Sequence, residues 1–100
     1  MGMFDYYVPV PAIGCPACSV PLHGWQGKGA HCLLLTWRQG ETSPRFHYPH
    51  DHPWNVIPEG ACLPDGDLSI YTTCENCHRW VDAEIYVHQG VWDETGEVSV

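Results

Sequence analysis

The sequence predicts an all-β fold, and three observations support this prediction. In residues 80–87, small aliphatic side chains occupy every second position, which is the period of a strand with one buried face. No segment combines apolar residues at a helical period with a capping residue, as an amphipathic helix would. The other apolar runs are short and end at glycine or proline. At 100 residues, the chain has the length of a single domain, residues 1–100.

The first third of the chain contains two predicted strands with a loop between them. Residues 4–10 are rich in strand formers, and their prolines limit them to an edge strand or an extended lead-in. Residues 21–29 contain three glycines around Trp25 and predict a loop with an aromatic anchor. Residues 31–37 form a short apolar run, which suits a buried strand better than a helix.

Residues 43–66 differ in composition from the rest of the chain. Five of the nine prolines and three of the seven histidines fall here, so neither a regular helix nor a central strand is expected. The segment also holds large apolar side chains that a free linker would lack. We therefore expect an ordered loop insertion that packs against the core, and we predict that its aromatic residues contact a partner: Phe46, Tyr48 and Trp54.

The last third of the chain predicts an antiparallel meander. A turn signal precedes a strand at residues 68–73. The alternating residues 80–87 form the next strand, which ends at a turn over residues 88–90. A last strand begins at Val91 and resumes at Val98.

Two C-x-x-C pairs are the most informative motifs of the chain: Cys15-Pro16-Ala17-Cys18 and Cys74-Glu75-Asn76-Cys77. Such a turn points two thiolates at one metal ion, and two turns complete the tetrahedral four-sulfur shell of a structural zinc site. The 55 residues between Cys18 and Cys74 mean that one Zn²⁺ ion would join the front of the chain to its back. The second pair lies between two predicted strands, and a strand, a C-x-x-C turn and a second strand form the hairpin of a zinc ribbon. The sequence therefore predicts a small zinc-ribbon-like antiparallel sheet, with the first pair on a facing loop.

Iron is the alternative to zinc at these cysteines. Two C-x-x-C turns in a small, acidic, aromatic-rich chain also resemble rubredoxin, an iron electron carrier. Rubredoxin turns are usually followed by glycine and lie closer together, whereas Ser19 and His78 follow the turns here. Thiol–disulfide exchange at the first pair would require a helix directly after it, and Pro21 and Gly24 disfavour one. One structural Zn²⁺ ion is therefore predicted, with iron as the alternative.

Four segments carry a resemblance to known proteins: the opening Met1-Gly2-Met3-Phe4-Asp5, the first C-x-x-C pair, Trp25-Gln26-Gly27-Lys28, and residues 71–82 around the second pair. In these segments the chain resembles a group of small, uncharacterised bacterial and bacteriophage proteins. The likeness leaves out the Pro/His-rich residues 43–66. The resemblance implies a metal-binding β domain in a bacterial or phage context, and it implies no activity.

A second metal site is a further hypothesis. Cys32 and Cys62 lie outside the two pairs, and His50-x-His52 on an extended chain would place both rings on one side, as a bidentate ligand requires. The plainer interpretation is that Cys32 is a small buried core residue and that the loop histidines are solvated. A Cys32–Cys62 disulfide would require an oxidising compartment.

The charge balance indicates the kind of partner. Four basic residues stand against twelve acidic residues, which gives a net charge of −8. Nucleic-acid binding normally requires a basic stripe, and four scattered cations cannot form one, so we do not expect it. An acidic domain could dock on a basic protein, although acidity alone also confers solubility.

The five tryptophans are more than a small core can bury completely, so we expect an exposed aromatic patch that suits a protein partner. In the alternative, Trp37 and Trp80 simply fill the core.

Nothing in the sequence marks the chain for export or for a membrane. The N-terminal residues lack a basic start followed by an apolar run, and no stretch approaches about 18 apolar residues. Six cysteines without a signal peptide fit a reducing interior, where C-x-x-C pairs bind metal. We expect a cytoplasmic protein of a bacterial or phage-infected cell.

No known catalytic motif occurs in the sequence. Zincin, nucleophile-elbow, P-loop and dinucleotide-binding patterns are absent, and no histidine has the glutamate two residues later that zinc deaminases carry. Asp65 and Asp67 are interpreted as turn formers rather than as a carboxylate pair.

The predicted function is a non-enzymatic, zinc-stabilised protein-interaction module or accessory subunit of a larger bacterial or phage assembly. The alternatives are a rubredoxin-like electron carrier and a metal-dependent enzyme with a second His/Cys site.

Overall fold

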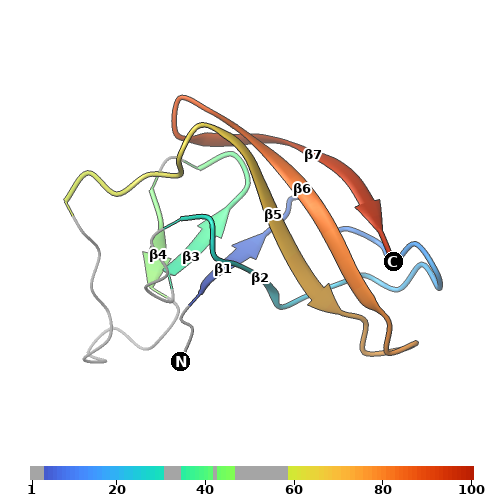
Figure 1. Ribbon diagram of the computed structural model, residues 1–100. Helices are drawn as coiled ribbons and strands as arrows, with labels where there is room; N and C mark the ends of the chain where they lie inside the picture. The colour runs from blue at the N-terminus through green and yellow to red at the C-terminus, as the bar shows by residue number, and fades with distance from the viewer. Residues whose placement is uncertain (1–3, 31–34, 42, 47–58) are drawn as a thin grey trace.

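A computed structural model describes residues 4–30, 35–41, 43–46 and 59–100, with the backbone alone at Phe46. Within these ranges the chain forms no helix, and seven strands make one sheet in the order β4-β3-β1-β2-β5-β6-β7 (Figure 1). The predicted all-β class is confirmed. The strands are β1 (Asp5–Val8), β2 (Trp25–Gly27), β3 (Leu35–Arg38), β4 (Arg45–Phe46), β5 (Gly66–Thr73), β6 (Trp80–His88) and β7 (Val91–Ser99).

The three longest strands form the predicted antiparallel meander β5-β6-β7. Strand β6 alternates buried and exposed residues along its whole length, because its aliphatic side chains all point to one face. Gln89 and Gly90, with φ angles of 51° and 78°, make the tight left-handed turn that a two-residue hairpin prefers. The Asp65 carboxylate accepts a hydrogen bond from the Gly90 N–H at 3.0 Å, so it joins the chain before β5 to the turn between β6 and β7.

Strand β1 lies inside the sheet and not at its edge. It pairs antiparallel with β2 on one side and parallel with β3 on the other. The edge-strand prediction for residues 4–10 is therefore wrong, and the sheet is mixed where a purely antiparallel one was predicted. Pro9 does not prevent this position, because the last paired residue is Val8 and the missing N–H of proline lies beyond the ladder.

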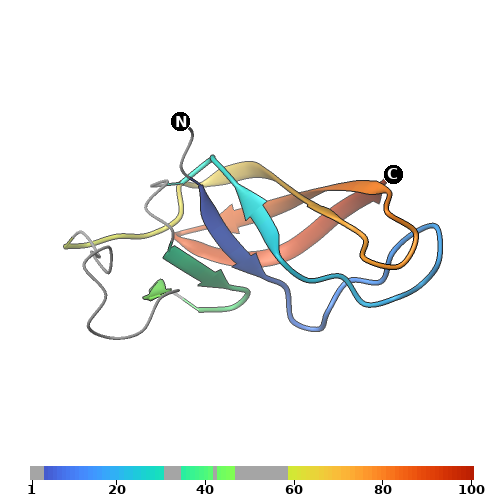
Figure 2. The same ribbon diagram turned by 90° about the horizontal axis from the view of Figure 1, so that it is seen from below.

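The sheet curls so that its two ends approach each other (Figure 2). The Gly40 N–H, just after β3, donates a hydrogen bond to the Trp92 carbonyl oxygen at the start of β7, with a donor–acceptor distance of 3.0 Å. Inside the curl, Tyr7 and Trp92 meet edge to face with their ring centroids 6.2 Å apart. The concave side encloses one apolar core, to which β1, β2, β3, β5, β6 and β7 all contribute buried side chains.

The four tryptophans that the structure describes divide between the core and the surface. Trp25, Trp37 and Trp92 are at most 1 % exposed, whereas Trp80 is 54 % exposed. Trp37 is therefore a core residue and Trp80 is not, which resolves the two roles that the sequence left open. Trp25, predicted on a loop, begins the short strand β2.

The predicted loop insertion at residues 43–66 is described only at its two ends. The short strand β4 pairs with β3 at the start of the segment, and β5 begins at Gly66. Residues 47–58, with most of the aromatic and histidine side chains of this segment, lie outside the described residues. In the described ranges, no helix has the length and apolar character needed to cross a membrane.

Candidate metal centre

The first C-x-x-C pair is held in a tight turn, residues 15–20, which we call the first knuckle. The Cys15 N–H donates to the Val20 carbonyl at 2.9 Å, and the Ser19 N–H donates to the Cys15 carbonyl at 2.8 Å. Pro16 supplies a fixed φ at the start of the turn, and a bridge between Gly14 and Pro21 closes its base. In this turn the two thiol sulfurs lie within 4.8 Å of each other.

The second C-x-x-C pair repeats this arrangement in residues 74–79, the second knuckle, between β5 and β6. The Cys74 N–H donates to the Arg79 carbonyl and the His78 N–H donates to the Cys74 carbonyl, both at 2.9 Å. These are the same two relative positions that are bonded in the first knuckle. Because both turns have one hydrogen-bond pattern, they present their sulfur pairs in the same way.

The two knuckles lie at the same end of the sheet and face each other (Figures 1 and 2). The Thr72 hydroxyl, at the end of β5, donates to the His23 carbonyl at 2.6 Å, which ties the chain after the first knuckle to the strand before the second. The candidate metal centre is thus built on two segments that are far apart in sequence and that the sheet already holds together.

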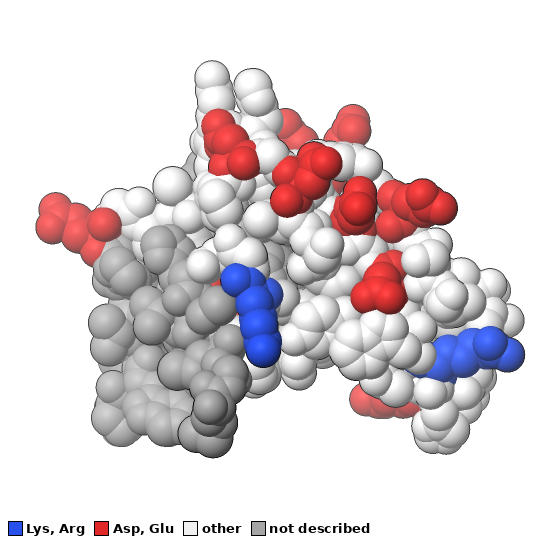
Figure 3. Space-filling model, viewed as in Figure 1, with Lys and Arg blue, Asp and Glu red and all other residues white. Residues whose placement is uncertain are grey.

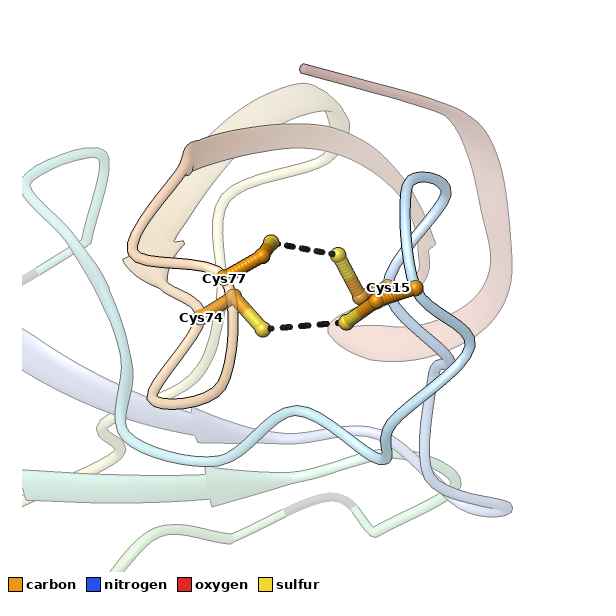
Figure 4. A group of neighbouring side chains, drawn as sticks. Cys15, Cys74 and Cys77 are labelled. Carbon is orange, nitrogen blue, oxygen red and sulfur yellow. Dashed lines mark hydrogen bonds between the residues drawn. The ribbon is translucent and has the colours of Figure 1, made fainter.

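The four cysteine sulfurs form one cluster, as the sequence predicts (Figure 4). The Cys15 and Cys77 Sγ atoms are 3.7 Å apart and the Cys18 and Cys74 Sγ atoms are 3.5 Å apart. All four sulfurs lie within 4.8 Å of one another. A tetrahedral zinc site with bonds of about 2.3 Å has sulfur–sulfur separations of about 3.8 Å. The cluster therefore fits a single tetrahedral ion with four thiolate ligands.

The electrostatics of the cluster also fit a cation. A hydrogen bond from the Asn76 side chain, together with one from the Val20 N–H, lowers the pKa of Cys18 to about 6 against the opposing effect of burial. At Cys77 the Arg79 N–H lowers the pKa, but burial and the three neighbouring sulfurs outweigh it and raise the pKa to about 11. Four crowded sulfurs cannot all ionise alone, and a divalent metal would supply the missing positive charge.

Both knuckles contain a non-glycine residue in the left-handed region. Ser19 has a φ of 68° and His78 has a φ of 61°, at the positions after Cys18 and Cys77 where glycine is usual in such turns. L-residues pay a steric cost in this conformation, and the turn imposes it nevertheless. Both knuckles therefore adopt the left-handed backbone at this position without a glycine.

The second predicted metal site is not tested by the described residues. Cys32, His50 and His52 lie outside them. Cys62 is exposed in the chain before β5, near Gly90 and away from the four-sulfur cluster. The predicted partner contacts Tyr48 and Trp54 also lie outside the described residues, and only the backbone of Phe46 is described.

One polar residue of structural importance went unrecognised in the sequence. The Asp5 carboxylate is fully buried and accepts hydrogen bonds from the Leu35 N–H and from the Trp37 indole N–H, each at 3.1 Å. No short motif predicts this contact, because its partners lie about thirty positions later in the chain. Asp5 positions β3 beside β1 and lies apart from the sulfur cluster.

In comparisons with known proteins, no family model, curated protein or solved structure matches the chain. The resemblance to small bacterial and phage proteins therefore stays a prediction.

Proposed function

We propose that this chain is a non-enzymatic protein-interaction module, stabilised by one structural Zn²⁺ ion at Cys15, Cys18, Cys74 and Cys77. The single observation that supports a structural ion is the closed ligand set. Four sulfurs within 4.8 Å of one another fill a tetrahedron, whereas catalytic zinc sites keep a position open for water or substrate. Cys15 and Cys74 are buried, so the ion would lie in the wall of the core.

The knuckle end of the molecule supports a role in protein contacts. Residues 6–27 contain no aspartate, glutamate, lysine or arginine. Val20 in the first knuckle, and Val8 and Val10 in the chain before it, are each more than a third exposed. A backbone held by a metal ion is already ordered. Exposed aliphatic side chains on it therefore lose little conformational entropy when a partner covers them, which favours binding. The role as accessory subunit is part of this proposal, and its bacterial or phage context derives from the sequence resemblance.

Metal analysis of protein purified without added metal is the direct test. We expect one zinc per chain, and we expect Co²⁺ substitution to give the visible spectrum of a tetrahedral tetrathiolate that added small anions do not change. Iron with reversible reduction would instead support the electron-carrier alternative. A second metal per chain, lost in His50→Ala or His52→Ala, would support the enzyme alternative.

The interaction role has its own test. The zinc-loaded protein is used as bait, and each captured protein is purified and titrated back. A saturable complex with wild type that is lost with Cys74→Ser supports the module. A zinc-loaded, folded chain for which no captured protein binds again in purified form would contradict it.

A further inference from the structure

An exposed tryptophan is fixed in place on the outer face of the meander. The Trp80 ring stacks on Tyr71 of the neighbouring strand, with centroids 4.9 Å apart and planes 15° from parallel. The Trp80 indole N–H donates to the Asp82 carboxylate at 2.9 Å. The ring is nevertheless 54 % exposed, so one aromatic face remains open to solvent. A large side chain held rigid and half-open is typical of a contact residue.

The outward positions of β6 continue from this tryptophan as a row. Every second residue points outward, and successive members of the row lie about 7 Å apart in a strand. The row is exposed throughout and contains two carboxylates between its aromatic rings: Trp80, Asp82, Glu84, Tyr86 and His88.

Two bulges in β7 hollow the surface beside this row. Between the pairs Ala83–Val98 and Ile85–Thr95, β7 has one residue more than β6, and the same occurs beside Tyr86. At the first bulge lies a depression of about 210 Å³, whose acidic lining residues are Asp82, Glu84 and Glu97. At the second lies one of about 500 Å³ lined by His88, Asp93 and Glu94, with Tyr86 and Val87. Neither depression has a lysine or arginine in its lining.

The negative charge of the chain is concentrated in this half. Residues 59–100 contain nine acidic residues and one basic residue, a balance of −8 that equals the net charge of the whole chain. Figure 3 shows the carboxylates gathered over the region of β5, β6 and β7. In the other half, Arg38 and Arg45 both pair with Glu41. No comparable excess of acid remains there.

From this juxtaposition we propose that the outer face of β5, β6 and β7 binds an extended, basic segment of another protein. We call this surface the acidic–aromatic face, defined by Tyr71, Trp80, Asp82, Glu84, Tyr86, Glu94 and Glu97. The inference rests on the proposed role as an interaction module and names the surface and the chemistry of the partner. A guanidinium or ammonium group would lie on the open face of Trp80, and a second would enter the depression beside Glu84.

Charge complementarity and spacing select this occupant. A second copy of the chain would bring its own charge of −8 against the same face, so self-association is disfavoured. In an extended peptide, alternate side chains recur with the same period as the row on β6. Cations at every second position of such a segment would therefore meet Trp80, then the carboxylates of Asp82 and Glu84.

The test is a titration of zinc-loaded, isotope-labelled protein with a synthetic peptide of alternating lysine or arginine and threonine, followed by NMR. We expect saturable shifts of the Trp80 indole N–H and of the backbone amides of Asp82, Glu84 and Glu97. Affinity should fall as salt rises, because the face is exposed to solvent. A peptide with glutamine in place of every cation should not bind.

Variants distinguish this face from general acidity and from the first knuckle. Trp80→Ala and Glu84→Gln should each weaken binding by roughly threefold to tenfold. The matched controls Glu59→Gln and Val20→Ala, exposed elsewhere, should change it less than twofold. Zinc content and amide spectra verify that each variant is folded.

Three results would overturn the proposal. These are no binding of the basic peptide to folded, zinc-loaded protein, equal weakening by Glu84→Gln and Glu59→Gln, or shifts confined to the first knuckle. In the last case the interaction module would stand and only its surface would change. If the chain held iron and cycled between two redox states, the proposed function itself would fail.

Discussion

The Asp5 carboxylate accepts a hydrogen bond from the Trp37 indole at 3.1 Å within the core, where Asp5 is fully buried. The same carboxylate accepts the Leu35 N–H, so it binds the backbone and a side chain of β3 together. Strands β1 and β3 run parallel, and a parallel pair cannot be joined by a tight turn. Asp5 therefore fixes the register of the pair that the chain connectivity leaves unspecified.

Removing either partner should destabilise the fold. In Asp5→Asn an amide N–H₂ faces donors that need an acceptor, and in Trp37→Phe the carboxylate loses one charge-assisted bond. We expect each change to lower the free energy of unfolding by about 1–3 kcal/mol, measured by urea denaturation. The double variant should cost less than the two single changes together, because both remove the same bond.

Asp67→Asn is the matched control for this pair. Asp67 lies exposed on β5, and its substitution should change stability by less than about 0.5 kcal/mol. Equal stability of Asp5→Asn and Asp67→Asn would show that the buried carboxylate does not hold β3.

An element of this fold could be predicted only if its own residues show a pattern that its surroundings impose. Strand β6 does, because burial of one face gives a period of two, and Trp80 occupies an outward-facing position of the strand as Asp82 and Glu84 do. The C-x-x-C pairs do as well, since metal ligation restricts their spacing. The interior position of β1 does not. It depends on partners at Leu35 and beyond, and an early aspartate before two prolines looks like an exposed lead-in.

A side chain at Gly27 of β2 should destabilise the fold. A Cβ there would lie 2.9 Å from Tyr7 Cε2, 3.0 Å from the Ser69 carbonyl oxygen and 3.2 Å from Ile70 Cγ2. Two of these atoms belong to buried side chains and one to backbone, so little can move. We expect Gly27→Ala to cost about 1–3 kcal/mol in thermal or urea unfolding.

Gly14 provides the comparison for Gly27. Its Cβ would lie 3.5 Å from the nearest atom, an ordinary contact, and its φ is not in the left-handed region. Gly14→Ala should be neutral or slightly stabilising. If both substitutions cost the same, the close approach of β2 to its neighbours would not explain the need for glycine.

Metal removal should loosen the knuckle end first. The free energy of binding a structural zinc is on the order of 10 kcal/mol, comparable with the whole stability of a small domain. We expect a chelator, or Cys74→Ser, to abolish protection of the Ser19 and His78 amides in hydrogen exchange and to lower the unfolding temperature. Metal should also be lost as pH falls, because protons compete for the thiolates.

Cys62→Ser is the control for metal loss, because Cys62 lies outside the four-sulfur cluster. We expect it to retain one zinc per chain and the unfolding temperature of the wild type. A fall from two metals to one in this variant would instead establish the second site with Cys32, His50 and His52.

Glycine at the left-handed position of either knuckle should stabilise the metal-loaded protein. Ser19 and His78 hold φ angles near +65° that cost an L-residue roughly 1–2 kcal/mol, and glycine adopts them without strain but loses more entropy on folding. Both residues are exposed, so little packing is lost. We therefore expect Ser19→Gly and His78→Gly each to raise the free energy of unfolding by about 0.5–1 kcal/mol.

The control is Ser69→Gly, at an exposed serine within β5. This substitution should instead lower the free energy of unfolding by about 0.5–1 kcal/mol, because a strand residue has no steric strain for glycine to relieve. Destabilisation by all three substitutions would mean that the serine and histidine side chains contribute contacts that outweigh the backbone strain.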